Sequence, residues 1–456
     1  MPITKSQFLN QFSKLALDDR ISLFLGAGGS RDAGYPNWAD LFLPFAKDLK
    51  ITIDESTDYY LLGQYYSNTF GQPELRKRIN EQINRNNYKS RLLDELINVG
   101  FTNIWTTNFD NSLEYNFQQR DVLINKVFRD TDYSNIDISK RINIFKMNGD
   151  VANLDGIVAT QSDFERYADT HRIMMMFFKR ELIASTFLFV GYSFTDHLVL
   201  EAMSEITRYL GGTTNVHYTI MKRKTDSAFS HFIDDLEKRY QLRVLLVDDY
   251  SEIPIVISEL NQLIRSKKVF VSGSFSTYGK EIEEYSHLLT RKMSEGLLDN
   301  KYRIVNGIGR RFGTHLIGYA NEYLARQGVK EIERHLIVRP FVGNEKNASN
   351  KKYLLREKVL STCGAAIFVF GENDRTARAG SSGVMEEFLI ARKQHKVIIP
   401  INYHGMVSEK IWEEVKSNLT EYPYLEGCID NLTATYPVDD LIRLIIHILD
   451  STREVI

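Results

Sequence analysis

Cysteine is scarce in this chain, which has only Cys363 and Cys428 in 456 residues. Two thiols cannot form a disulfide scaffold or a four-cysteine zinc site, so we expect no metal and a reducing compartment such as the cytoplasm. An excess of either charge is also missing, because 57 lysines and arginines face 59 acidic residues and the formal net charge is -2. This balance gives no electrostatic reason to expect a nucleic-acid or membrane partner. No apolar run is long enough to span a bilayer, and the first residues lack the apolar core of a signal peptide.

The sequence does contain a regular alternation of apolar strands and amphipathic helices. With 43% apolar and 25% charged residues it is an ordinary globular chain, long enough for two or three domains. The alternation predicts an α/β fold with two Rossmann-like, doubly wound domains. We place the boundary near residue 267, which gives domains at 1–267 and 268–456. Predicted strands of the first domain are 21–25, 101–105, 143–147, 186–190, 216–221 and 242–250, and Pro36 is expected in the first turn of a helix.

The stretch Ile21–Arg31 is the strongest single signal, because an apolar strand runs directly into Gly26-Ala27-Gly28-Gly29-Ser30. Glycines at such a turn let main-chain N–H groups approach a phosphate closely, and the Ser30 hydroxyl adds a donor. The spacing fits neither the dinucleotide fingerprint nor a P-loop, since Arg31 replaces the third glycine and there is no lysine. A tight strand-to-helix turn without a ligand explains the pattern equally well.

Three further strands of this domain end in polar residues. The ends are Thr106-Thr107-Asn108-Phe109-Asp110, Asn148-Gly149-Asp150 and Gly191-Tyr192-Ser193. Taken singly, Asn108 reads as a helix N-cap and Asn148 as part of a turn. Asp248, after the last strand, is either a turn residue or a contact to an adenosine. Four polar strand ends at one sheet edge are harder to explain as chance, because ligands of open parallel sheets bind there.

The order of four motifs resembles that of sirtuin-like NAD-binding domains over roughly residues 1–265, and in particular the antiphage-defence type without a zinc module. The motifs are Gly26–Ser30, Thr106–Asp110, Lys146-Met147-Asn148-Gly149 and Phe187–Ser193. The resemblance implies an NAD⁺ hydrolase that cleaves the nicotinamide–ribose bond. It assigns NAD⁺ contacts to the following residues: Gly26, Ala27, Gly28, Ser30, Thr107, Asp110, Gly191, Ser193 and Asp248. It also gives Asn108 the task of orienting ribose or water.

One position departs from the sirtuin-like pattern. The family has a histidine as general base before the glycine of the third motif, and this chain has Asn148. A carboxamide cannot accept a proton near neutral pH, and loss of a general base typically costs about 10²–10⁴-fold in rate. We therefore expect a strongly impaired enzyme. His171 and His197 are alternative bases, although a lone histidine in a helix is more often a packing or surface residue.

The second half starts again with a strand and a glycine turn, Val269–Ser274, and continues with strands at 302–306, 335–338, 365–370 and 397–401. Their glycine-rich ends predict a second nucleotide pocket. The segment resembles the SLOG family of nucleotide-signal sensors. In Thoeris-type defence effectors, which have this domain order, the SLOG pocket binds a cyclic ADP-ribose isomer made by a TIR-domain partner, and binding activates NAD⁺ hydrolysis in a homotetramer. The effector-site residues expected here are Gly273, Ser274, Gly307, Gly309, Arg356, Asn373 and Glu387.

Within that set, Arg356 matches the family's phosphate-binding arginine and Glu387 its acidic ribose contact, while Asn373 stands where the family has a lysine. A guanidinium binds phosphate oxygens in a forked geometry. Without the resemblance, Arg356 reads as a surface charge and Glu387 as a first-turn acid that complements the helix dipole. Two other functions remain open: a nucleotide sensor without catalysis, which Asn148 favours, and an NAD⁺-dependent protein deacylase, which the missing zinc cysteines disfavour.

Overall fold

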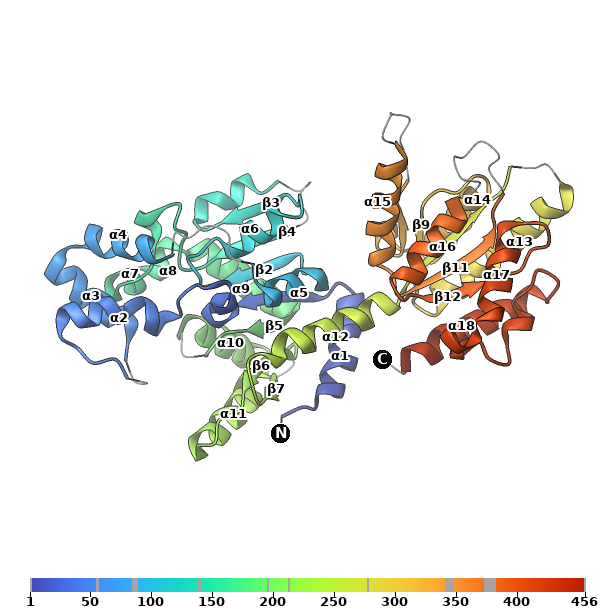
Figure 1. Ribbon diagram of the computed structural model, residues 1–456. Helices are drawn as coiled ribbons and strands as arrows, with labels where there is room; N and C mark the ends of the chain where they lie inside the picture. Colours follow the sequence, from blue (N-terminus) through green and yellow to red (C-terminus); the bar gives the residue numbers. More distant parts are fainter. Residues whose placement is uncertain are drawn as a thin grey trace. The chain divides into compact units, whose positions relative to one another are not determined.

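The structure is a computed structural model (Figure 1) that describes residues 2–54, 57–83, 89–137, 139, 142–194, 197–211, 214–276, 279–340, 348–372 and 383–454. The chain divides into two compact units, Met1–Asn261 and Gln262–Ile456. The division falls within helix α12 (Glu252–Ser266), a few residues before the predicted boundary near 267.

The first unit contains a seven-stranded parallel sheet in the order β3-β4-β2-β1-β5-β6-β7. The strands are β1 (Ile21–Leu25), β2 (Asn103–Thr106), β3 (Ile124–Val127), β4 (Ile142–Lys146), β5 (Thr186–Val190), β6 (His217–Lys222) and β7 (Leu242–Val247). Strand order reverses at β1, between β2 and β5, so this is the topological switch point at which a crevice opens over the carboxyl ends. The α/β fold class is confirmed.

Helices surround this sheet (Figure 1). They are α1 (Lys5–Leu17), α2 (Trp38–Leu49), α3 (Tyr59–Phe70), α4 (Gln72–Ile83), α5 (Arg91–Val99), α6 (Ser112–Gln118), α7 (Gln161–Glu165), α8 (Tyr167–Thr170), α9 (Arg172–Ala184), α10 (His197–Tyr209) and α11 (Ser227–Tyr240). Two expectations need correction. Strand β3 was not predicted from the sequence, because it is short and alternates buried with half-buried residues. Pro36 precedes α2 instead of lying in its first turn, because Asn37 is the N-cap and its side chain accepts the Asp40 N–H.

The second unit contains a five-stranded parallel sheet in the order β10-β9-β8-β11-β12. Its elements are β8 (Lys268–Ser274), α13 (Lys280–Asp299), β9 (Arg303–Asn306), α14 (Phe312–Arg326), β10 (Leu336–Val338), α15 (Ala348–Ser361), β11 (Ala365–Phe370), α16 (Gly383–Lys393), β12 (Val397–Pro400), α17 (Val407–Ser417) and α18 (Val438–Glu454). The switch point is at β8, with β9 on one side and β11 on the other. All five strands match the predicted ones to within a few residues.

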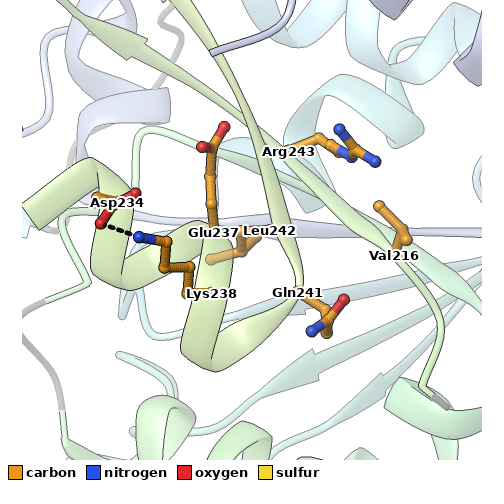
Figure 2. A pocket seen from close by; sticks show the side chains of 7 residues that line it. All are labelled: Val216, Asp234, Glu237, Lys238, Gln241, Leu242 and Arg243. Atoms are coloured by element: carbon orange, nitrogen blue, oxygen red, sulfur yellow. Dashed lines mark hydrogen bonds and ion pairs between the residues drawn. The ribbon is translucent and has the colours of Figure 1, made fainter. Parts of the chain in front are cut away.

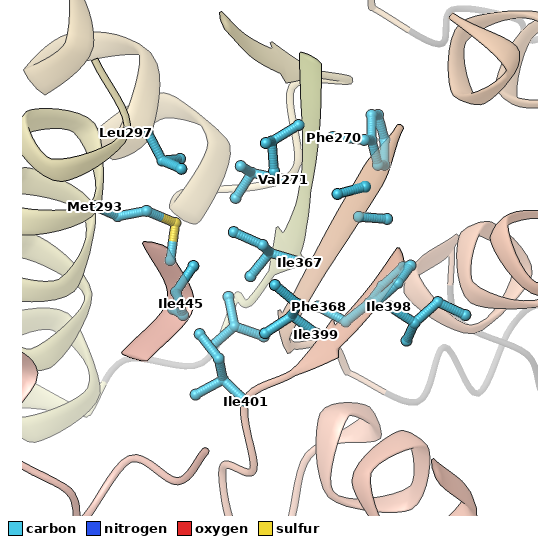
Figure 3. Packing of buried hydrophobic residues seen from close by; sticks show 14 of the residues in the cluster. Phe270, Val271, Met293, Leu297, Ile367, Phe368, Ile398, Ile399, Ile401 and Ile445 are labelled. Atoms are coloured by element: carbon cyan, nitrogen blue, oxygen red, sulfur yellow. The ribbon is translucent and has the colours of Figure 1, made fainter. Parts of the chain in front are cut away.

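The core of this unit explains why its strands read as continuous apolar runs. Figure 3 shows Val271, Ile367 and Ile399 on one face of the sheet, toward Met293 of α13 and Ile445 of α18. On the opposite face, the Phe368 ring meets Phe388 of α16 edge-on at 5.8 Å between centroids. A parallel sheet covered on both faces needs apolar side chains at every position. Strands β8 and β11 are therefore held firmly in the core, and so are the starting points of the loops at their carboxyl ends.

Candidate functional site

The glycine turn after β1 packs directly on the turn after β5. A Cβ on Gly26 would lie 2.4 Å from the Gly191 oxygen, and one on Gly191, where φ is +66°, would lie 2.1 Å from the Gly29 nitrogen. The N–H groups of Gly26 and Gly28 donate to the carbonyls of Val190 and Gly191, both at 2.9 Å. These glycines thus let two backbones touch at the switch point, and these two N–H groups are engaged inside the protein. Their part in NAD⁺ binding stays a prediction.

Asn108 joins this turn to the end of β2. Its Nδ2 donates to the Gly26 carbonyl at 3.1 Å and to Ser30 Oγ at 3.0 Å, and its own N–H is bonded to Thr106 Oγ1 at 3.0 Å. Helix α6 begins at Ser112 with Asn111 as N-cap, so Asn108 is not the helix cap. Its Oδ1 is buried and has no hydrogen-bond partner among the described residues. An acceptor in this position is ready for a hydroxyl donor.

Asn148 occupies the neighbouring strand end, since β4 pairs with β2 and the Met147 N–H donates to the Thr106 carbonyl at 2.8 Å. The residue is fully buried, and its Nδ2 donates to the Tyr60 hydroxyl at 3.1 Å. Its Oδ1 likewise has no partner within the described part of the chain. Leaving such a buried acceptor unsatisfied costs about 1–3 kcal/mol. Two carboxamide oxygens in this state, at adjacent strand ends, mark the site.

A buried charge network lies beside these strand ends. Lys146 Nζ contacts Asp150 Oδ2 at 2.7 Å and Glu114 Oε1 at 3.1 Å, and it donates to the Phe109 carbonyl at 3.1 Å. Burial lowers the pKa of the Lys146 ammonium, but the Glu114 and Asp150 carboxylates outweigh it and the pKa is raised. Burial raises the pKa of Asp150, yet Lys146 outweighs this effect and the pKa is lowered. Both groups are therefore charged at neutral pH.

This network was not predicted from the sequence. The signal was a lysine at the end of the apolar strand Ile142–Lys146, followed four residues later by an aspartate. By bonding the Phe109 carbonyl, Lys146 ties the end of β4 to the loop that carries Asn108, so it positions both carboxamides. Tyr60 was missed as well, because nothing in the local sequence of α3 links it to β4.

Some of the other residues predicted for the first site lie near Asn108, and Asp248 does not. Ser30, Thr107 and Asp110 are buried around Asn108, and Asp110 accepts the Ser112 N–H at 2.9 Å. Asp248 is not brought to them: β7 is three strands from β1, about 14 Å at the usual spacing, and the Asp248 side chain is 82% exposed and paired with Arg223.

Further residues are placed less directly. Ser193 is exposed and lies in the turn after β5. Of the alternative bases, His171 stacks on Tyr167 at 4.3 Å between centroids, and the side chain of His197 lies outside the described residues.

A second site is a cavity of about 520 Å³ at the switch point of the second unit. It is lined by Phe270–Ser276 at the end of β8, Asn306–Arg310 after β9, Lys352 and Arg356 of α15, Glu372, and Gly383, Val384 and Glu387 of α16. Six of the seven predicted effector residues line it. The seventh, Asn373, lies outside the described residues.

Backbone proximity shapes the floor of this cavity. A Cβ on Gly309 would lie 1.9 Å from the Gly273 oxygen, so only glycine fits. The residue before it, Ile308, has φ +57°, and its N–H donates to Asn306 Oδ1 at 2.7 Å. A bulky residue in the left-handed region is strained, and such strain is common at binding sites. Asn306 was not singled out from the sequence.

The polar wall of the cavity is an arginine held by carboxylates. Arg356 Nε donates to Glu387 Oε1 at 3.1 Å, Arg356 also pairs with Glu386, and Ser272 Oγ donates to Glu387 Oε2 at 2.5 Å. Burial raises the pKa of Glu387, and Arg356 opposes this effect only in part. Arg356 is therefore no surface charge, and Glu386, not Glu387, is the first-turn acid of α16.

Another hollow, of about 260 Å³, has no such features. Figure 2 shows its lining between α11 and the beginnings of β6 and β7, with Lys238 paired to Asp234 of the same helix at 2.6 Å. It lies at the amino ends of the strands, the edge of this sheet opposite to the first site. We assign it no function.

Comparisons with known proteins find matches in both halves of the chain. The SIR2-like domain family matches residues 102–245, and the Sir2- and TIR-associating SLOG family matches residues 252–452. The chain is 26% identical to NAD(+) hydrolase ThsA of Bacillus cereus (strain MSX-D12), over 97% of both chains. It is 25% identical to the protein of the same name from Cytobacillus dafuensis, over 99% of this chain and 98% of that one. The chain is a relative of the ThsA proteins over nearly its whole length.

A third ThsA relative, from Acinetobacter baumannii (strain 532279), is 26% identical over 95% of both chains. The resemblance drawn from the sequence is thus confirmed. We refer to the first unit as the SIR2-like unit and to the second as the SLOG unit. Within the described residues, no helix is both long and apolar enough to cross a membrane.

Proposed function

We propose that the protein is a defence effector of the NAD⁺ hydrolase type, with NAD⁺ as the substrate of the SIR2-like unit. The names of its relatives support this activity. The observation that carries it is the pair of unpartnered buried oxygens, Asn108 Oδ1 and Asn148 Oδ1, at adjacent strand ends beside the switch point. Ribose hydroxyls are donors of the kind these acceptors need.

Asn108 is placed to hold the ribose or the attacking water. Breaking the nicotinamide–ribose bond develops positive charge on the sugar, so the site must fix the sugar and exclude bulk water. The burial of Asn108 and Asn148 meets the second requirement. The assigned contacts of Gly26, Ala27, Gly28, Ser30, Thr107, Asp110, Gly191 and Ser193 to NAD⁺ belong to this proposal.

The reaction is slow in this sequence, because Asn148 cannot act as a general base. Its amide donates to Tyr60 and offers no proton-accepting nitrogen. A sensor that binds NAD⁺ without cleaving it is the second candidate function, and the same observation favours it.

The SLOG cavity is proposed to bind a cyclic ADP-ribose isomer made by a TIR-domain partner. Arg356 supplies a forked donor for a phosphate, and Glu387 supplies an acceptor for a ribose hydroxyl. Ligand binding there activates the hydrolase. The chain forms a homotetramer with an inactive and an active arrangement, and the ligand binds the active arrangement more tightly.

The test is Asn148→His in the full chain, with nicotinamide release measured by chromatography in the presence and absence of a cyclic ADP-ribose isomer. An imidazole at this position is expected to raise the rate about 10²–10⁴-fold. Asn148→Gln is the matched control, because it keeps a carboxamide and gains no base. Calorimetric titration of NAD⁺ into both variants separates the candidates. Binding without nicotinamide release in Asn148→His refutes the hydrolase and leaves the sensor, and no binding refutes both.

A further inference from the structure

Two histidines and a glutamate form a cluster in the SLOG unit that neither proposed activity uses. Glu283 and His287 lie one turn apart on α13, and His315 lies in the first turn of α14. The two helices pack along one another, and the imidazole rings stack at 3.9 Å between centroids. The three side chains therefore come from two elements and meet at one point.

The distances suit a small cation. His315 Nε2 lies 3.5 Å and His287 Nε2 lies 4.0 Å from Glu283 Oε1, and the candidate ligand atoms all lie within 4.8 Å of one another. In a tetrahedral zinc site with bonds of about 2.0–2.1 Å, ligand atoms are about 3.3 Å apart. To bind one cation, the two imidazoles have to turn out of their stacked arrangement, because nearly parallel rings direct their nitrogens along parallel lines.

The other polar atoms of these side chains already have partners. His287 Nδ1 is bonded to the Tyr319 hydroxyl and His315 Nδ1 to Ser286 Oγ, each at 3.0 Å. Arg311 holds Glu283 Oε2 at 2.7 Å, which leaves Oε1 toward the rings. Metal-binding histidines typically have their second nitrogen bonded in this way, and ligating carboxylates are themselves hydrogen-bonded.

The geometry brings three potential ligand atoms together from two helices. Two ring nitrogens and one carboxylate oxygen lie within 4.8 Å of one another, while the other polar atoms of the same side chains are engaged elsewhere. The side chains of Glu283 and His287 are 31% and 45% exposed, so a cation and a water ligand have access.

We propose that Glu283, His287 and His315 bind a divalent cation of the zinc class, with water as the remaining ligand. This site is separate from both nucleotide sites and does not depend on the proposed function. It lies close to the SLOG cavity, since the His315 ring contacts Phe275 of the cavity wall at 6.2 Å between centroids. The cation would cross-link α13 and α14 beside that wall.

The experiment is a calorimetric titration of ZnCl₂ into the chelator-treated full chain, with cobalt(II) absorption as a second readout of the coordination sphere. We expect one zinc per chain, and binding about 100-fold weaker in His287→Ala and Glu283→Gln. His404→Ala is the matched control. His404 also pairs with a glutamate, at 2.7 Å from Glu409, but this pair belongs to no three-residue cluster among the described residues. Zinc binding is expected to be unchanged in this variant.

His287 and Glu283 are chosen because they are partly exposed, and circular dichroism of the metal-free variants verifies folding. The absence of saturable zinc binding in the wild-type chain overturns the proposal. So does wild-type affinity in both His287→Ala and Glu283→Gln, or an equal loss in His404→Ala.

Discussion

Replacing Lys146 with methionine is expected to destabilise the SIR2-like unit strongly. The Lys146 side chain is 1% exposed, and its partners Asp150 and Glu114 are 0% and 15% exposed. Methionine keeps most of the volume but leaves the carboxylates without their central cation. Removing one partner of a buried ion pair typically costs about 3–5 kcal/mol. Lys126 still contacts Asp150 at 3.1 Å, so we expect the lower end of that range, about 3 kcal/mol.

The assay is urea unfolding of the full chain followed by tryptophan fluorescence. The chain has three tryptophans, Trp38, Trp105 and Trp412, and only the first two belong to the SIR2-like unit. In a Trp412→Phe background, the emission therefore reports this unit alone. That separation matters because a chain of two units need not unfold in one step.

Lys222→Met is the matched control for this prediction. Lys222 is also the last residue of a strand in the same sheet and also pairs with an aspartate, at 3.1 Å. Its side chain is 38% exposed, and exposed ion pairs contribute about 0–1 kcal/mol. If Lys146→Met costs no more than Lys222→Met, Lys146 does not hold the strand ends together and our reasoning on the site is wrong.

Two further predictions concern the SLOG cavity and pH. Arg356→Ala is expected to weaken binding of a cyclic ADP-ribose isomer by about 10–100-fold in calorimetry, because a charge-assisted bond to phosphate contributes about 1.5–3 kcal/mol. Arg356→Lys is expected to have an intermediate affinity. Unchanged affinity in Arg356→Ala would show that this arginine does not bind the ligand. Burial lowers the pKa of His217 to about 3, below its ordinary value of 6.5, so the unfolded state binds the proton first and stability falls as the pH drops from about 6.5 toward 3. At pH 5 the free energy of unfolding is lower by about 2 kcal/mol. In the same unfolding assay, the stability of His217→Gln should depend less steeply on pH than that of the wild-type chain. Parallel plots of stability against pH for the two proteins would contradict the lowered pKa of His217.

The sequence was sufficient to predict the parallel architecture, and the reason is local. Strands such as Ala365–Phe370 are buried on both faces and flanked by turns, so their apolar runs are unambiguous. The short strand β3 was missed, because buried and half-buried residues alternate along Ile124–Val127 and form no such run. Likewise, Pro36 suggested a helix start, while the side-chain cap of Asn37 decides where α2 begins.

The candidate sites were predicted where strand ends carry polar residues and missed where partners come from distant segments. Asn108, Asn148, Arg356 and Glu387 were singled out from motifs. Tyr60 is 88 residues from the Asn148 that it contacts, and Glu114 is 32 residues from Lys146. Asp248 follows a strand like the others, but only the sheet order reveals that its strand is at the far edge. Pairings over such separations depend on the topology, which a sequence pattern does not specify.

If the SLOG cavity binds a nucleotide as proposed, the carboxylates around Arg356 affect which ligands it selects. Because Glu386 and Glu387 already neutralise the guanidinium, a visiting molecule must displace one of them before it gains the arginine. A simple anion offers only an exchange of one negative charge for another and therefore has little advantage. A nucleotide brings a phosphate that pairs with the arginine, together with sugar hydroxyls that donate to the released carboxylate. The arginine and the displaced glutamate then both keep a hydrogen-bond partner. Under the proposed function, the Arg356–glutamate contact therefore favours nucleotides over free inorganic phosphate.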